Sequence, residues 1–175
     1  MNDVFRPYLR KFVLVFFDNI LIYSPLEESH QQHLAQVLEV LHTNTLYANI
    51  KKCEFGKTQV AYLGHIISEE GVAADQSKVQ AMVSWPTPIN LKALRGFLGL
   101  MGYYQKFVAV YAQISFPLTD QLKEDKFGWN SNASTTFEEL KHAMSTVPGL
   151  AMPDFSKPFF IEIDASGFGS GAILI

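Results

Sequence analysis

The sequence has little cysteine, little net charge and no long apolar run, and each shortage excludes a class of protein. Cys53 is the only cysteine, so an internal disulfide and a zinc site made of several thiolates are excluded, and a reducing compartment is favoured. The net charge of −3 gives no general attraction to nucleic acid or to an anionic membrane. Any contact with a polyanion therefore has to be local.

The longest apolar runs have the length of a strand, so we expect no transmembrane helix and no membrane partner. The opening stretch MNDVFRPYLRK lacks the apolar core of a signal peptide, so the location, otherwise unknown, is expected to be intracellular. The chain has 175 residues, of which 48% are apolar, enough to bury the core of one domain or of two small ones.

Short strand patterns and helical patterns occur together, which predicts an α+β fold. Residues 12–23 are rich in β-branched and aromatic residues and are interrupted by Asp18-Asn19, so we expect a hairpin with these two residues at its turn. Residues 24–44 repeat apolar residues at three- and four-residue spacing, which predicts an amphipathic helix. Its start carries a capping signal made of Ser24, Pro25 and Glu27.

Further elements are expected downstream, with a boundary near residues 70–75. They are strands over 47–55 and 59–68, a short helix capped by Asp75, a helix over 91–108, an amphipathic helix over 135–146, and a hairpin that opens with a strand over 159–164. In the helix over 91–108, Gly96, Gly99 and Gly102 predict either close helix packing or a break.

Few of the polar residues indicate chemistry by themselves. Asp18-Asn19 reads as an ordinary turn pair, because both residue types tolerate left-handed backbone conformations. His30 and His33 have a permissible metal spacing but no third ligand, so we expect them at the surface. The glycines at 167, 169 and 171 lie between two strands, where a phosphate-binding loop is not expected.

Several longer stretches change this interpretation. VLVFFDNILIYS resembles the tyrosine-x-Asp-Asp hairpin of reverse transcriptases, and the surrounding sequence resembles gypsy-type long-terminal-repeat retrotransposon polymerases in order and spacing. The other stretches that carry the resemblance are MNDVFRPYLRKF, KKCEFGKTQVAYLGHIISEEGV, LRGFLGLMGYYQKF, PLTDQLKEDKFGW and FEELKHAMSTVPGLAMPDFSKPFFIEIDASGFGSGAIL.

The resemblance implies three parts. Residues 1–72 would be the carboxyl part of the reverse-transcriptase palm with its primer-grip hairpin, residues 73–126 the thumb, and residues 127–175 a linker helix and the start of a ribonuclease H-like domain. The palm strand that precedes the hairpin and the later ribonuclease H strands would lie outside this chain, so we expect a truncated fragment.

The resemblance also implies catalytic positions. Asp18 matches the first turn aspartate that holds Mg²⁺ in the family, Asn19 stands at the second aspartate position, and Phe16 replaces the usual tyrosine. Asp164 matches the first metal-binding aspartate of ribonuclease H, although by itself it reads as a strand-end residue. Because an amide brings no negative charge, we expect a degenerate site at Asp18 and Asn19 that does not hold Mg²⁺ tightly.

Nucleic-acid contacts follow from the same resemblance. The partner would be an RNA–DNA hybrid or a primer–template duplex. Without the resemblance, such lysines and arginines read as ordinary solvated surface. The residues expected at the duplex are Tyr62, Leu63, Gly64 and His65 of the primer grip, Lys51, Lys52 and Lys57 beside it, and Lys92, Arg95 and Lys106 of the thumb.

The sequence thus predicts a fragment of a retrotransposon reverse transcriptase and ribonuclease H that is inactive by itself. Two alternatives remain open at this point: a non-catalytic module that binds nucleic acid or protein, and a relic without a dedicated role. Because both sheets would be incomplete, we also expect self-association through exposed sheet edges.

Overall fold

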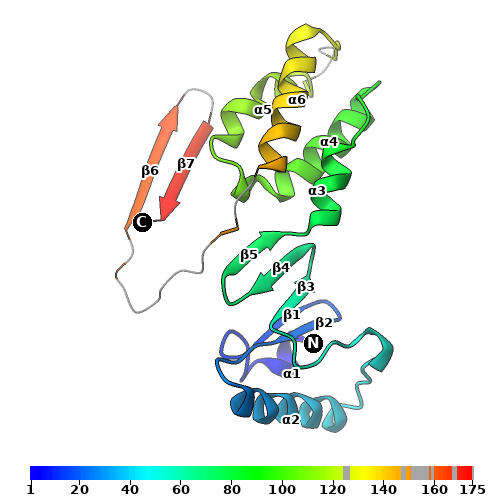
Figure 1. Ribbon diagram of the computed structural model, residues 1–175, viewed down its shortest axis with the longest axis vertical. Coiled ribbons are helices and arrows are strands. Elements are labelled where there is room, and N and C mark those ends of the chain that lie inside the picture. Colours follow the sequence, from blue (N-terminus) through cyan, green and yellow to red (C-terminus); the bar gives the residue numbers. More distant parts are fainter. Residues whose placement is uncertain (124–126, 147–148, 151–157, 159, 167–168, 175) are drawn as a thin grey trace. The chain divides into compact units, whose positions relative to one another are not determined.

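The computed structural model describes residues 1–123, 127–146, 149–150, 158, 160–166 and 169–174. The chain divides into two compact units, Met1–Tyr62 and Leu63–Ile175 (Figure 1). Each unit contains its own cluster of buried apolar side chains. The domain limits expected at residues 72 and 126 remain predictions.

The first unit is a strand hairpin with helices packed against one face. Its elements are α1 (Asn2–Phe5), β1 (Val13–Phe16), β2 (Asn19–Ile22), α2 (Glu27–Thr43), the 3-10 helix η1 (Ile50–Lys52) and β3 (Gln59–Tyr62). The buried cluster consists of Phe5, Phe12, Val13, Val37 and Leu41. The hairpin and the long helix are therefore confirmed.

The hairpin turn lies one residue earlier than expected. Val13 pairs with Ile22 and Val15 with Ile20, which leaves residues 17 and 18 at the turn and makes Asn19 the first residue of β2. This register places all four β-branched side chains on the face that packs against the helices. Burial of that face, and not the turn preference of Asp18-Asn19, sets the register.

The capping signal expected at the start of α2 is wrong. The helix begins at Glu27 with Leu26 at the N-cap position, and no side chain caps it. The Ser24 hydroxyl instead lies 2.7 Å from Nδ1 of His33 and 3.3 Å from Nδ1 of His30. These histidines are partly buried, and the His33 ring stacks on Phe12 at 3.8 Å, so they are less exposed than expected.

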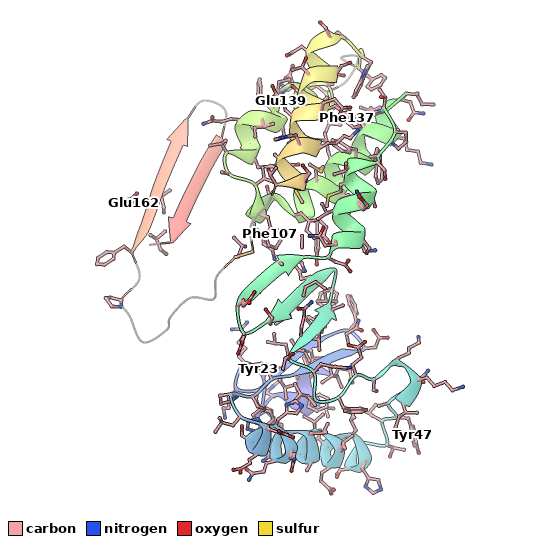
Figure 2. All side chains as sticks on the ribbon, in the orientation of Figure 1. Tyr23, Tyr47, Phe107, Phe137, Glu139 and Glu162 are labelled. Atoms are coloured by element: carbon pink, nitrogen blue, oxygen red, sulfur yellow. The ribbon has the colours of Figure 1, made fainter. Side chains whose placement is uncertain are left out.

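The strand expected over residues 47–55 is not formed. Asn49 accepts a hydrogen bond from the Lys51 amide through its side chain at 3.1 Å, and the chain makes the short helix η1 at that point. A local bond of this kind competes with strand pairing. Tyr47 is 90% exposed, and Figure 2 shows it at the periphery of this unit.

The second unit joins a two-stranded hairpin to a group of helices and ends in another hairpin. Its elements are β4 (His65–Ser68), β5 (Gly71–Ala74), α3 (Gln76–Val83), α4 (Leu91–Tyr103), the 3-10 helix η2 (Gln105–Phe107), α5 (Tyr111–Asp120), α6 (Ser131–Ser145), β6 (Ile161–Ser166) and β7 (Gly169–Leu174). Within it, β4 pairs antiparallel with β5, and β6 pairs antiparallel with β7.

Side-chain caps start three of these helices. Asp75 accepts from the Ser77 amide at 2.8 Å, as expected, and hydrogen bonding by Ser77 lowers the pKa of the Asp75 carboxyl. Asn90 and Asn130 cap α4 and α6 in the same way, each at 2.8 Å. Such caps satisfy amides that have no partner within the helix.

Helices α4 and α6 supply the centre of the second core. Phe97 and Phe137 are almost fully buried, with ring centroids 4.5 Å apart, and Figure 2 shows Phe137 pointing in among the helices. Close packing or a break was expected at the glycines of α4, and the helix is continuous through Gly96 and Gly99 without a break. A Cβ atom at Gly99 would meet nothing within 4 Å.

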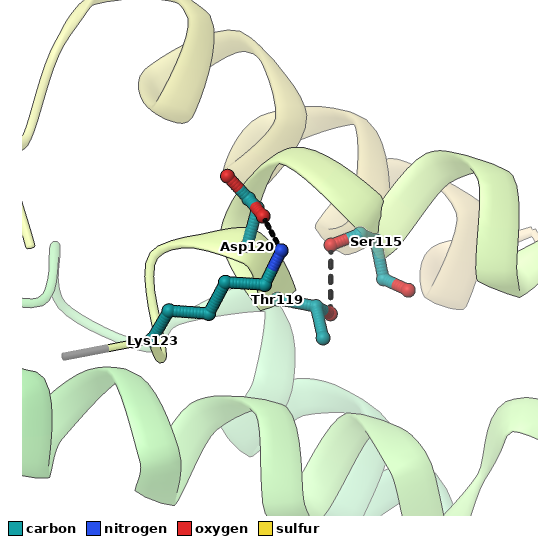
Figure 3. Close-up of polar contacts among 4 residues, drawn as sticks. All are labelled: Ser115, Thr119, Asp120 and Lys123. Carbon is teal, nitrogen blue, oxygen red and sulfur yellow. Dashed lines mark hydrogen bonds and ion pairs between the residues drawn. The ribbon is translucent and has the colours of Figure 1, made fainter. Parts of the chain in front are cut away.

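Helix α5 was not expected from the sequence, and it contains Pro117, a residue that usually breaks a helix interior. Proline has no amide to donate, but polar side chains hydrogen-bond around this turn of the helix (Figure 3). The Thr119 hydroxyl donates to the Ser115 carbonyl at 3.0 Å, and Lys123 pairs with Asp120. In the described part of the chain, no helix combines the length and apolar character needed to cross a membrane.

Candidate functional site

The tip of the β1–β2 hairpin is exposed and strained. Phe17 has a φ of +53°, a left-handed value that is unusual for an aromatic residue, and its side chain is 79% exposed. Phe16 is half-exposed and meets Phe17 edge to face. Asp18 is exposed beside them. A surface hollow of about 610 Å³ is lined by Met1, Asn2, Val15, Phe16, Phe17 and Asp18.

Asn19 contributes to this hairpin through its backbone. It pairs with Phe16 across the turn, and its carbonyl accepts a long hydrogen bond of 3.5 Å from the Tyr62 hydroxyl. Burial raises the pKa of Tyr62, so this hydroxyl keeps its proton at neutral pH. The Asn19 side chain is therefore not needed to form the turn.

The residues at this tip do not fit a two-metal centre. Two divalent cations need several carboxylate oxygens around them, and Asp18 is the one carboxylate at the turn. Among the described residues, no group of three or more His, Cys, Asp or Glu side chains is placed to hold a metal ion.

Leu63 and Gly64, which were expected in the primer grip, form a tight turn that follows β3 and precedes β4, and their role at a primer remains a prediction. Leu63 and Gly64 have φ values of +51° and +74°, the sign that a tight two-residue hairpin turn of type I′ requires at both positions. The Nδ1 atom of His65 lies 2.9 Å from the Leu63 carbonyl. Since a carbonyl only accepts, Nδ1 carries the proton in this contact.

Two tyrosines that sequence reasoning missed hold the same turn. The Tyr103 hydroxyl donates to the Leu63 carbonyl at 2.7 Å, and the Tyr104 hydroxyl donates to the Gly64 carbonyl at 2.8 Å. Both rings also lie against His65, with centroids 5.3 and 5.5 Å away. The available signal was an aromatic pair at the end of a glycine-containing helix, which is more often simple core packing.

Tyr104 differs from Tyr103 in burial. Tyr104 is 1% exposed and Tyr103 is 51% exposed. Burial is the main cause that raises the pKa of Tyr104, with smaller contributions from Tyr103 and Asp75. The Tyr104 hydroxyl therefore remains a donor throughout the neutral range.

The basic residues expected at a duplex are exposed in both units. Lys51 and Lys52 lie in η1 of the first unit, and Lys57 follows them. Lys92 and Arg95 lie on the exposed face of α4 in the second unit. The sequence placed these cations correctly at the surface, but their contact with nucleic acid remains a prediction.

Two further residues with an expected role are Lys106, expected at the duplex, and Asp164, expected as a metal ligand. The Lys106 ammonium lies 5.3 Å from the centroid of the Phe107 ring. The backbone of Asp164 pairs with Gly171 in the β6–β7 hairpin, and its side chain lies outside the described residues, as does position 167. Its role as a metal ligand remains a prediction.

Two family models match the chain. The model of reverse transcriptase (RNA-dependent DNA polymerase) matches residues 1–67, and the model of the RNase H-like domain found in reverse transcriptase matches residues 129–175. The Pol polyprotein of transposon 297 from Drosophila melanogaster is 39% identical over 99% of this chain. The chain belongs to the retrotransposon Pol polyprotein family.

The similar proteins differ in how much of their own length this chain spans. An uncharacterized mitochondrial protein of Arabidopsis thaliana is 50% identical over 75% of this chain and 84% of its own length. The chain spans 17% of the transposon 297 polyprotein, and 13% of the transposon Tf2-7 polyprotein of Schizosaccharomyces pombe, to which it is 35% identical.

Solved structures of a viral reverse transcriptase show the same fold. The foamy viral protease-reverse transcriptase, solved with an RNA/DNA hybrid, matches 99% of this chain and 26% of its own with a TM-score of 0.83 and 19% identity. Its complex with dsDNA matches with a TM-score of 0.79. The Pol chain described here therefore has the mixed fold of a reverse-transcriptase palm and thumb followed by the start of an RNase H-like domain.

Proposed function

We propose that this Pol chain is a duplex-gripping part of a reverse transcriptase and that it does not polymerise by itself. In this proposal the turn of Leu63 and Gly64 and the exposed cations contact a primer–template duplex or an RNA–DNA hybrid. Asp18 and Asn19 occupy the family's metal turn. Intact enzymes of this family generally use divalent metal at that turn, and Asp164 is its counterpart in the RNase H-like part.

The main support for inactivity is the tip of the β1–β2 hairpin. The backbone around Asp18 and Asn19 keeps the hairpin, while an amide stands where the family has a second carboxylate. An amide oxygen can approach Mg²⁺ but does not offset its charge, and hard cations prefer carboxylate oxygens. The hairpin thus keeps the shape of a metal turn with one of its charges missing.

The exposed cations support the proposal of duplex binding. A chain of net charge −3 has no overall attraction to a polyanion, so binding has to come from local groups. Lys92 and Arg95 lie one helical turn apart on α4, and both are exposed, which suits contact with successive phosphates.

We expect the chain to bind a labelled RNA–DNA hybrid at low salt. The double variant Lys92→Glu and Arg95→Glu should bind more weakly, and the slope of log K against log salt should fall by about two, because each phosphate contact contributes about one. Fluorescence anisotropy across a salt series measures both quantities.

The matched control is the double variant Lys11→Glu and Lys78→Glu, which makes the same charge change at exposed lysines that have no proposed contact. It should leave the slope close to that of the unmodified chain. An equal loss in both double variants would mean that net charge alone governs binding. Absence of binding by the unmodified chain at low salt would show that the proposed function is wrong.

We also propose self-association through exposed strand surfaces. Leu14 and Phe16 on β1 are 37% and 50% exposed, and Ile161 and Ile163 on β6 are 64% and 75% exposed. Apolar strand faces of this kind favour pairing with another chain. Light scattering after gel filtration should show a mass that rises with protein concentration, and Ile161→Lys with Ile163→Lys should reduce that rise. A constant monomer mass for the unmodified chain would contradict this proposal.

A further inference from the structure

We propose that Tyr103 and Tyr104 are positioning residues that fix the shape of the turn formed by Leu63 and Gly64, so that the end of α4 sets the geometry of the primer grip. The role of the turn in gripping a primer rests on the proposed function. The link between the tyrosines and the turn rests on two hydrogen bonds from their hydroxyls to the turn carbonyls.

Adjacent residues of α4 and its C-cap bind successive carbonyls of the turn. Tyr103 donates to Leu63 at 2.7 Å and Tyr104 donates to Gly64 at 2.8 Å, both ordinary distances for a hydroxyl donor. The Gly64 carbonyl also accepts the Asp75 amide at 3.1 Å. Both central residues of the turn are therefore tied to the end of one helix.

The turn needs such support because its backbone is not the one that its residues prefer. Leu63 has a φ of +51°, and a non-glycine residue in the left-handed region persists only where the surroundings hold it. Gly64 is also required by space, because a Cβ atom there would lie 2.5 Å from the Tyr104 hydroxyl oxygen. The fit between Gly64 and Tyr104 is therefore specific.

Tyr104 is itself positioned by the core, and Tyr103 precedes it at the end of the same helix. Tyr104 is 1% exposed, and its ring lies 6.2 Å from that of Phe107, which is also buried. The preceding turns of α4 bury Leu94, Phe97 and Met101. A shift of α4 would therefore move both hydroxyls and with them the two carbonyls of the turn.

This arrangement links two expected contacts with the duplex. Lys92 and Arg95 lie on α4, and Tyr103 ends the same helix. A duplex that repositions α4 through its phosphates would at the same time reposition the turn that grips the primer end. The tyrosine pair thus provides a rigid connection between duplex contact at the thumb and the placement of the primer.

The test uses the variants Tyr103→Phe and Tyr104→Phe, singly and together, in the full 175-residue chain. Tyr111→Phe is the matched control, because Tyr111 is a partly buried tyrosine on α5 whose pKa burial also raises. NMR-detected exchange of the Asp75 amide reports the turn, because this amide donates to Gly64. Thermal unfolding reports the fold as a whole, and hybrid affinity reports the proposed function.

We expect exchange of the Asp75 amide to accelerate by about fivefold for each lost hydroxyl that supports the turn. The midpoint of thermal unfolding should stay close to that of Tyr111→Phe. Incorporating 4-aminophenylalanine at position 104, which restores a donor, should bring the exchange rate back toward that of the unmodified chain.

The outcomes separate the two claims. Exchange in the double variant equal to that of Tyr111→Phe would overturn the positioning role, whatever happens to hybrid affinity. Faster exchange together with weaker hybrid binding supports both the positioning role and the primer grip. Faster exchange with unchanged hybrid binding supports the positioning of the turn by the tyrosines and shows that the proposed function of the turn is wrong.

Discussion

Replacing Gly64 by alanine should lower the free energy of unfolding of the second unit by about 2 to 5 kcal/mol. The new Cβ atom would lie 2.5 Å from the Tyr104 hydroxyl oxygen, and the residue would have to keep a φ of +74°. Left-handed backbone costs about 1 to 2 kcal/mol for a residue with a side chain, and overpacking adds about 1 to 3 kcal/mol. Chemical denaturation followed by circular dichroism measures the change.

Two companion variants make this result specific. Gly99→Ala makes the same chemical change within α4, where a Cβ atom meets nothing within 4 Å, so it should stabilise by about 0.5 to 1 kcal/mol. Tyr104→Phe combined with Gly64→Ala removes the clashing oxygen, and the next ring atom is 3.7 Å away. The double variant should be less destabilised than the sum of the two single variants. Simple additivity would show that the hydroxyl does not contact Gly64.

Restoring the second carboxylate of the metal turn should raise polymerisation roughly 10- to 100-fold in a fusion, because the loss of even an outer-shell group costs a metal site that much. The fusion joins this chain to the segment that precedes the matched region in the transposon 297 polyprotein. The Asn19→Asp fusion is compared with the unmodified fusion on one primer–template. Initial rates of primer extension are measured at equal protein and Mg²⁺ concentrations.

The unfused chain provides the control. Metal-site groups act as a unit and are strongly non-additive, so Asn19→Asp in the unfused chain should recover almost nothing. We also expect no release of labelled RNA from a hybrid by the unfused chain. Equal rates for the two fusions would show that the amide is no defect. Extension by the unfused Asn19→Asp chain would show that one restored carboxylate is sufficient.

The sequence predicted the elements whose signals are local. The Asp75 cap and the apolar spacing of Phe137, Leu140 and Met144 were both found where expected, because a cap and an amphipathic face depend on residues close together in the chain. The β1–β2 hairpin was predicted for the same reason. The resemblance to the Pol family also predicted that Asp18 and Asn19 stand at the two aspartate positions of the family's metal turn.

What the sequence did not predict depends on distant contacts. The turn lies at residues 17 and 18, and not at the expected 18 and 19, because the helices bury one face of the hairpin. Nothing within the turn itself indicates this register. Ser24 does not cap the helix as expected, because its hydroxyl contacts His33, which lies nine residues further along the chain. The support of Gly64 by Tyr104 joins residues forty positions apart, which no local pattern indicates.

The backbone contacts of Asn19 have a consequence for how a cell handles such a protein. Asn19 contacts Phe16 and Tyr62 through its backbone atoms, so we expect another small polar side chain at this position to leave the fold unchanged. Chaperones and proteases recognise unfolded chain and have no means of detecting a missing charge at an exposed tip. A copy carrying this substitution is therefore invisible to protein quality control and can accumulate as well-folded material regardless of whether it polymerises.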